Sequence, residues 1–292
     1  MRLDLKNCRA CEPLVKLLQK LIIHYDYAQA DETTVQVLDE VGRSNKTKSY
    51  MWCYCGGGKT TSIVYEYQPT RGGYHAEQFL NGFKGYLQSD AYSGYNFIDK
   101  NNDITRVGCM AHARRKFTDV IKASKSNGLA TEAIKYFRAL YKIEKDMREN
   151  NLSPEKRCDL RDEKSKPILT SFKTWLDIHL TKTPEQSKIG LAIRYSLSNW
   201  DELTAFLKDG RIEIDNNLLE NAIRPFALGR KNWLFAGSPS GAKAGAILYS
   251  LIETCKANNV EPYKYFCAML HSLRHCKSAE DYQKLLPQFI QF

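Results

Sequence analysis

The chain has 292 residues, of which 43% are hydrophobic and 26% charged, a composition that excludes a disordered protein and predicts a sizeable core. Its 43 Lys and Arg against 33 Asp and Glu leave a net charge of +10, which is compatible with a polyanionic partner such as DNA. No apolar run reaches the ~20 residues that cross a bilayer, and we find neither a secretory signal nor a regular cysteine framework. We therefore expect a cytoplasmic protein with reduced thiols and no membrane contact.

The first part of the chain predicts a helix followed by a sheet. Leucine and isoleucine recur at helical spacing in PLVKLLQKLIIHYD, so we expect a leading helical segment over residues 1–26. Three β-rich runs, QADETTVQVLD, SYMWCYC and TSIVYEYQP, are separated by turn signals and predict three strands in meander order. A helix is expected around residues 75–83, followed by strands at GYLQSD and ITRVGCMAH with a turn at residues 92–95 between them. The first part of an α/β domain, a mixed sheet with helices on both faces, therefore spans residues 27–116.

Strand signals disappear between residues 117 and 208, where TEAIKYFRALYKIEKDM and PILTSFKTWLDIHL have helical spacing. Their apolar stripes comprise Leu140, Ile143 and Met147 in the first segment, and Leu169, Phe172, Trp175 and Leu176 in the second. We expect a helical insertion that lies outside the sheet. Residues 209–258 should complete the sheet domain, with a helix in AKAGAILYSLIETCKANN, and Pro262 should open a helical tail over residues 259–292.

Three carboxylates are candidates for a metal centre. Asp31 is predicted at the start of the first strand, in ADETTVQV, and Asp90 at the end of a later strand, in YLQSDAYSGY. Carboxylates at strand ends can meet in one cleft and share divalent cations, which prefer oxygen ligands. Glu220 is the third candidate, because IDNN precedes a helix that carries it in its first turns.

Each of these acids also has an ordinary structural interpretation. An Asp at the end of a strand is usually a turn former. Glu220 follows Asn217 by three residues, so it fits a capping box, and it can pair with Arg224 one turn later. The three residues taken singly therefore predict little, and the segments around them decide between the interpretations.

Those segments resemble the transposases of the insertion-sequence-66 family (TnpC type) over nearly the whole chain. They are ADETTVQVLDE, KSYMWCYCGG, GYLQSDAYSGYN, CMAHARRKF, IDNNLLENAIRPFALGRKNWLF and AGAILYSLIETCKANNVEPYKYF. The family carries its first catalytic Asp in the ADET motif, its second in LQSDAY and its Glu in NNxxEnaiRP, which fall on Asp31, Asp90 and Glu220. The resemblance also implies a ribonuclease-H-like fold with a helical insertion before the Glu, and a DDE-type catalytic core.

The resemblance implies a reaction and its partners. The three carboxylates would hold Mg²⁺, with Mn²⁺ as a substitute, for cleavage at transposon ends by water and strand transfer by a 3′-hydroxyl. The implied partners are transposon-end and target DNA, bound by a homo-oligomer in the bacterial nucleoid. Two alternatives stay open: a ribonuclease-H-like nuclease that cuts without joining, and a catalytically idle DNA-binding remnant.

The match departs from the family at its beginning. Family members carry a long N-terminal part with a coiled coil, a helix-turn-helix and a cysteine-rich region, whereas here only thirty residues precede Asp31. We therefore expect a separately encoded or truncated catalytic half. Such a chain should bind DNA through its phosphates with little preference for sequence.

Basic residues gather beside the candidate carboxylates. The first cluster comprises Arg224, Arg230, Lys231 and Lys243, with no acidic residue between Glu220 and Glu253. The second comprises Arg106, Arg114, Arg115, Lys116, Lys122 and Lys125, with Asp119 as its only acid. Such runs are commonly solvated faces, but beside a metal centre they predict phosphate contacts. The resemblance adds His112 to these contacts, and Trp233 is expected either in the core or as a stacking platform for an unpaired base.

The motif CMAH, with Cys109 and His112, resembles half of a zinc site. A structural zinc ion takes four ligands, and neither the cysteines of NCRAC nor those of WCYC provide a matched pair at finger-like spacing. We therefore expect Cys109 to be buried in the core and His112 to lie near the metal cleft.

Overall fold

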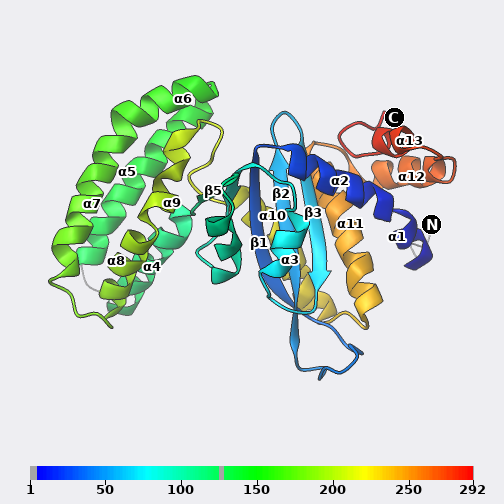
Figure 1. Ribbon diagram of the computed structural model, residues 1–292, viewed down its shortest axis with the longest axis horizontal. Helices are drawn as coiled ribbons and strands as arrows, with labels where there is room; N and C mark the ends of the chain where they lie inside the picture. Colours follow the sequence, from blue (N-terminus) through cyan, green and yellow to red (C-terminus); the bar gives the residue numbers. More distant parts are fainter. Residues whose placement is uncertain (1–4, 125–127, 292) are drawn as a thin grey trace. The chain divides into compact units, whose positions relative to one another are not determined.

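The computed structural model describes residues 5–124 and 128–291 (Figure 1). Lys125, one of the basic residues expected to contact DNA, lies outside these ranges. The chain forms two compact units. Unit 1 comprises residues 1–87, 92–105 and 218–292, and unit 2 comprises residues 88–91 and 106–217. Among the described residues, we find no helix that is both long enough and apolar enough to cross a membrane.

A five-stranded sheet has the strand order β3-β2-β1-β4-β5. Its strands are β1 (Tyr27–Gln36), β2 (Lys48–Gly57), β3 (Thr61–Gln68), β4 (Gly85–Gln88) and β5 (Ile104–Val107). The first three strands pair antiparallel. The N–H groups of Gly85 and Ser89 bond to the carbonyls of Asp103 and Val107, so the bonds advance in the same direction along β4 and β5, as in parallel strands. The predicted α/β class with a mixed sheet is therefore confirmed.

Several predicted boundaries were wrong. Asp31 is the fifth residue of β1 rather than its start, because the pairing with β2 already includes Ala28. The strand expected at ITRVGCMAH ends at Val107, and α4 (Met110–Ser124) begins inside that segment. The helix expected at residues 75–83 is the shorter α3 (Tyr74–Phe79), and the expected turn at 92–95 opens the 3-10 helix Ser93–Lys100.

Helices cover both faces of the sheet in unit 1. They are α1 (Leu5–Ala10), α2 (Glu12–His24), α3, α10 (Asn217–Trp233), α11 (Pro239–Ala257), α12 (Pro262–Leu273) and α13 (Ala279–Lys284). Side chains alternate between the faces of a strand, so Ala30 and Tyr54 pack with the α2 side, where Leu18 is buried. Val35 and Cys53 face the other way and pack with residues of α10.

Helix α11 also covers the edge of the sheet. Three of its side chains, spaced one turn apart, bond to backbone N–H groups of alternate residues along the outer strand β3. The bonds run from Thr61 to Asn258 Oδ1 at 3.0 Å, from Ile63 to Thr254 Oγ1 at 3.0 Å and from Tyr65 to Ser250 Oγ at 2.8 Å. The helix therefore replaces a sixth strand and protects an edge that would otherwise be open to pairing.

Within the described residues, unit 2 is mainly helical over the predicted insertion. It contains α4, α5 (Leu129–Glu149), α6 (Pro154–Leu160), a π-helical turn (Arg161–Ser165), α7 (Lys166–Leu180), α8 (Lys188–Ser198), α9 (Trp200–Thr204) and the 3-10 helix Ala205–Lys208. No strand occurs in residues 117–208 within the described ranges. Phe117, Phe137 and Phe172 pack ring against ring in its core. The prediction of an almost wholly helical segment is therefore confirmed for the described residues.

A buried ion pair ties this helical unit to the segment before α10. The guanidinium of Arg161, which is 0% exposed, donates two 2.8 Å bonds to the carboxylate of Glu144. Its remaining N–H groups donate to the backbone carbonyls of Phe206, Asp209 and Ile212, at 2.7, 3.0 and 2.8 Å. The arginine therefore fixes the chain path between the 3-10 helix Ala205–Lys208 and α10.

Candidate active site

Asp31 lies on the face of β1 that packs under α10. Its register partner is Cys53, which belongs to the apolar cluster shared with α10. Burial raises the pKa of the Cys53 thiol well above its usual value, and the neighbouring Cys55 and Asp31 raise it further. Asp31 itself is half-buried, and its Oδ1 accepts the N–H of Glu32 at 2.7 Å. A half-buried carboxylate therefore faces the α10 side of the sheet.

The neighbouring acid, Glu32, points to the opposite face and is committed to the fold. Its Oε1 lies 2.6 Å from the guanidinium of Arg71, and its Oε2 accepts the hydroxyl of Tyr95 at 3.0 Å. This carboxylate is almost completely shielded from solvent. Two adjacent acids of the ADET motif therefore have different surroundings.

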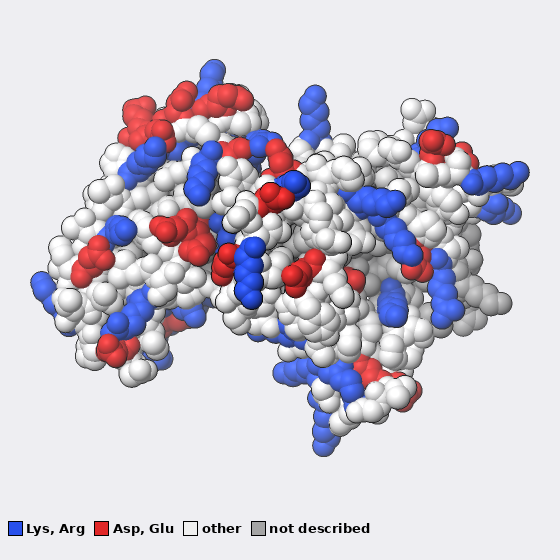
Figure 2. Space-filling view, viewed as in Figure 1, with Lys and Arg blue, Asp and Glu red and all other residues white. Residues whose placement is uncertain are grey.

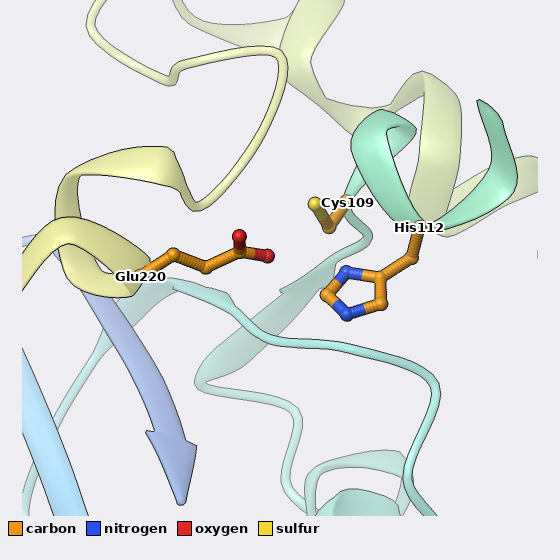
Figure 3. A group of neighbouring side chains, drawn as sticks. All are labelled: Cys109, His112 and Glu220. Atoms are coloured by element: carbon orange, nitrogen blue, oxygen red, sulfur yellow. The ribbon is translucent and has the colours of Figure 1, made fainter. Parts of the chain in front are cut away.

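Glu220 lies in the first turn of α10 and is half-buried. The N–H of its neighbour Leu219 donates to Oε1 of Gln29 at 3.1 Å. Gln29 is 2% exposed and precedes Asp31 by two residues, so both side chains lie on the same face of β1. The turn that carries Glu220 is therefore bonded to the strand that carries Asp31. Figure 3 shows the Glu220 side chain extending from this turn.

The start of α10 is held by another acid. Asp215 is buried; its Oδ1 accepts the N–H of Asn217 at 3.1 Å, and its Oδ2 accepts the hydroxyl of Tyr141 at 2.7 Å. Arg224, the alternative partner of Glu220, forms no ion pair in residues 5–124 and 128–291. The pairing of Glu220 with Arg224 one turn later is therefore not formed.

Asp90 follows the last residue of β4 by two positions and is half-buried. The pKa of the Tyr195 hydroxyl is raised to about 12, mainly by burial and next by the negative charge of Asp90. The preceding Gln88 is 0% exposed and donates to the carbonyls of Gly108 at 3.1 Å and Glu213 at 2.9 Å. Within unit 2 the end of β4 is therefore bonded to the start of α4 and to the segment before α10.

The two buried glutamines are functional candidates that the analysis of the sequence missed. Gln29 precedes Asp31 by two residues, as Gln88 precedes Asp90. The repeated spacing Gln-x-Asp was a signal for them, because residues i and i+2 of a strand share one face. Asp31 and Glu220 are brought to one side of unit 1, and Asp90 belongs to unit 2; the convergence of all three stays a prediction.

Replacing Gln29 with leucine should destabilise the protein by about 1–3 kcal/mol, because it leaves the N–H of Leu219 without its acceptor. Urea denaturation measures this loss. Gln36→Leu is the matched control in the same strand, since the Gln36 amide bonds to Asn45 at an exposed position, and we expect a change within about 0.5 kcal/mol. Equal effects of the two substitutions would contradict the positioning role of Gln29.

Comparison with known proteins identifies the family. Residues 5–244 match the family described as "Transposase IS66 family", and residues 250–288 match the "IS66 C-terminal element". The chain belongs to the transposase IS66 family. The chain is also 37% identical over 272 residues to "Uncharacterized protein y4qI" of Sinorhizobium fredii, an alignment that covers 88% of this chain and 50% of the relative. The resemblance inferred from the motifs is therefore confirmed.

Two further relatives from the same organism have similar sequence identities to this chain and similar coverages. "Uncharacterized protein y4hP" is 33% identical over 89% of this chain and 50% of its own length. "Uncharacterized protein y4jD" is 32% identical over 90% of this chain and 53% of its own length. The chain therefore spans about half the length of these curated relatives.

The basic residues expected to bind DNA fall in both units. Arg114, Arg115 and Lys116 are exposed on α4. The guanidinium of Arg114 lies over the ring of Tyr141 at 4.6 Å, and the ammonium of Lys116 lies over that of Tyr195 at 5.2 Å. These ring contacts hold two of the cations without neutralising them. On the face drawn in Figure 2, cations and acids are interspersed rather than gathered into one patch.

In unit 1 the cations lie on α10 and α11. Arg224, Lys231 and Lys243 are exposed. Arg230 is half-buried, and its guanidinium donates to Thr34 Oγ1 at 3.0 Å and to the Thr34 carbonyl. None of the four forms an ion pair within the part of the chain that is described. Their charges are therefore not neutralised by neighbouring acids.

Cys109 and His112 lie at the start of α4 (Figure 3). Cys109 is buried, as expected, and burial raises the pKa of its thiol to about 12. The backbone N–H groups of Asn216, His112 and Ala111 point at this sulfur and oppose the shift. The burial of Cys109 agrees with the interpretation of this residue as a core side chain.

Proposed function

We propose that this chain carries the catalytic centre of a DNA transposase, in which Asp31, Asp90 and Glu220 are the metal ligands. The observation that carries the proposal is the bond from Leu219 to Gln29, which fixes the turn of Glu220 to the strand of Asp31 within unit 1. Membership of the transposase IS66 family supports a shared role for these carboxylates. A ribonuclease-H-like topology fits the sheet order, in which the antiparallel strands β1 to β3 are followed by two parallel strands.

The three carboxylates fit a hard divalent cation. All three are half-buried, so they keep the access to solvent that an ion and a phosphate need. Mg²⁺ and Mn²⁺ prefer oxygen ligands. When bound, such ions supply charge stabilisation to phosphoryl transfer between a hydroxyl and a DNA phosphate.

The surrounding residues would position the ligands. Gln29 and Asp215 hold the first turn of α10, and Gln88 holds the end of β4, in each case from a buried position. Buried hydrogen-bonded side chains lose little further freedom when an ion binds, which is the arrangement that precise metal positioning requires. The exposed cations of α4, α10 and α11 would hold the DNA backbone.

The test is cleavage and joining of labelled duplexes that carry the ends of the encoding element. We expect Mg²⁺ or Mn²⁺ to support cleavage and transfer of the cut strand into a target plasmid, and EDTA to abolish both. Cleavage without joined products would identify a nuclease instead. Binding without cleavage under every metal condition would identify an idle DNA-binding remnant and overturn the proposal.

DNA affinity should fall steeply with salt, with a slope of log affinity against log salt near −5. Each phosphate that is neutralised on duplex DNA contributes about 0.9 to this slope, and we expect five or six such contacts. Replacing Lys231 and Lys243 with alanine should reduce the slope by up to about 2. Both are exposed, whereas Arg230 also bonds to β1 and is less suitable for this test.

Fluorescence anisotropy on an element-end duplex and a scrambled duplex measures the slope. The double substitution should weaken both duplexes alike, because phosphate contacts carry no sequence information. A hundredfold preference for the true end would contradict binding through phosphates alone.

A further inference from the structure

An aromatic cavity lies between α10 and α11 on the sheet face that carries Asp31. We call it the α10–α11 cavity, and its volume is about 310 Å³. It is lined by Val35, Met51, Phe226, Trp233, Phe235, Ala236, Gly237, Gly241, Ala242, Gly245 and Tyr249. Trp233 is 36% exposed and Phe235 43%, so the cavity opens to solvent. The core position that the sequence favoured for Trp233 was wrong, since its side chain is exposed.

One wall of the cavity is made of fixed aromatic rings. The ring of Phe226 lies 5.3 Å from that of Trp233 and 5.2 Å from that of Tyr249, both edge to face. Phe226 is buried in the apolar cluster beneath. The exposed indole of Trp233 therefore packs on the buried ring of Phe226 and offers a flat apolar surface at the mouth of the cavity.

Glycines form a second wall, and packing within the protein does not require them. A Cβ atom on Gly237 or Gly245 would meet no atom within 4 Å, and one on Gly241 would meet only Ser238 Oγ at an ordinary 3.5 Å. Gly229 is different, because its Cβ would lie 2.8 Å from the Tyr249 hydroxyl. A glycine inside a helix costs about 1 kcal/mol relative to alanine. The cavity glycines therefore keep open a space that the chain itself does not fill.

Two cations lie beside one edge of this apolar space. Arg230 donates to Thr34, the neighbour of the lining residue Val35, and Lys231 precedes Trp233 by two positions on the last turn of α10. Lys243 of α11 lines other cavities instead. None forms an ion pair within the described residues. An apolar slot with cations at one edge matches a ligand that has a flat apolar part joined to phosphates.

We propose that the α10–α11 cavity binds one unpaired nucleobase of the bound DNA, stacked on Trp233 and lying against the glycine wall. The inference rests on the proposed function, because DNA must be held for a base to enter. A base has two apolar faces and arrives with a phosphate on each side, so it suits both the walls and the cations at one edge.

The test compares binding to two duplexes of one sequence, the first fully paired and the second with a single unpaired adenine. Stacking of a base on an aromatic side chain predicts a preference of about tenfold for the second duplex. Gly245→Val should fill the slot and Trp233→Ala should remove the stacking surface, and each should abolish the preference while binding of the paired duplex is retained. Valine is no worse than glycine in a helix, so Gly245→Val should keep the thermal midpoint.

Tyr263→Ala is the matched control, because Tyr263 is an aromatic residue of unit 1 that is 77% exposed and does not line the cavity. It should keep the preference. Equal binding of the two duplexes by the unsubstituted chain, or a preference that survives both cavity substitutions, would overturn the inference while leaving the proposed function intact. A change in oligomeric state with Gly245→Val and no change in base preference would assign the cavity to a second copy of the chain and overturn it as well. Loss of binding to both duplexes by the unsubstituted chain would reject the proposed function too.

Discussion

Replacing Asp31 with asparagine should reduce metal-dependent DNA cleavage by at least about a thousandfold while leaving the fold stable. The substitution keeps the shape of the side chain and removes the charge that a divalent ion requires. A metal supplies several kcal/mol of transition-state stabilisation, and about 4 kcal/mol corresponds to a thousandfold change in rate. The rate is measured by single-turnover cleavage of a labelled duplex at saturating protein, and stability is measured by urea denaturation.

The adjacent acid provides a control with the opposite expectation. Glu32→Gln should weaken the bonds to Arg71 and Tyr95 on the other face of β1. We expect it to cost about 1–3 kcal/mol of stability, because a shielded hydrogen-bonded charge is lost. Its cleavage rate, measured where the variant is folded, should stay within a few-fold of the unsubstituted chain. A normal rate for Asp31→Asn together with a lost rate for Glu32→Gln would show that the metal ligand in the ADET motif is the other acid.

The same substitution at the remaining carboxylates tests whether the three residues act together. Asp90→Asn and Glu220→Gln should each cause a loss similar to that of Asp31→Asn. Combining them should add little, because residues that act as one unit have effects that are not additive. This result would also test the convergence of Asp90, in unit 2, with the two acids of unit 1. If the fold-losses in cleavage rate of the single variants multiply in the double variants, the three carboxylates have separate roles.

The order of the elements was predictable from the sequence, because hydrophobic period and turn residues are local signals. The meander of β1 to β3, the helical insertion and the helix opened by Pro262 were all predicted. The end of β5 was not, since VGCMAH alternates enough to resemble a strand. Met110, Ala113 and Phe117 are nevertheless buried at helical spacing, and the N–H of Met110 bonds to the carbonyl of Ile214. That bond joins residues far apart in the chain, which a local pattern cannot reveal.

The candidate carboxylates were predictable as a set only through the family resemblance. Spacing alone left turn formation and capping as alternatives for each acid. The structure explains why the surroundings of Asp31 and Glu32 differ. Side chains alternate along β1, so Asp31 faces α10 whereas Glu32 faces Arg71 and Tyr95. The structure also adds Gln29 and Asp215, whose roles depend on partners that lie far away in the sequence. These roles could not be predicted from the sequence, because they depend on hydrogen bonds between residues that lie far apart in the chain.

Replacing Glu144 with alanine should destabilise the protein by about 3–5 kcal/mol, because it leaves a fully buried guanidinium without its countercharge. Arg161 donates to both oxygens of this carboxylate and has no solvent access. Arg157 also loses a partner, since its guanidinium lies 3.2 Å from Glu144. Urea denaturation at constant pH and salt measures the change. Glu185→Ala is the control, because its ion pair with Arg194 is exposed and should contribute less than about 1 kcal/mol.

The loss should arise from the unpaired charge rather than from the missing side chain. The double substitution Glu144→Leu with Arg161→Met removes both charges, and apolar replacements of buried ion pairs are often neutral. Here the carbonyls of Phe206, Asp209 and Ile212 lose their donor as well, so we expect recovery of only part of the stability. We expect cleavage to stay reduced in the double variant, because those carbonyls belong to the segment that leads into α10 and Glu220. Full recovery of both stability and cleavage would show that Arg161 does not position this segment.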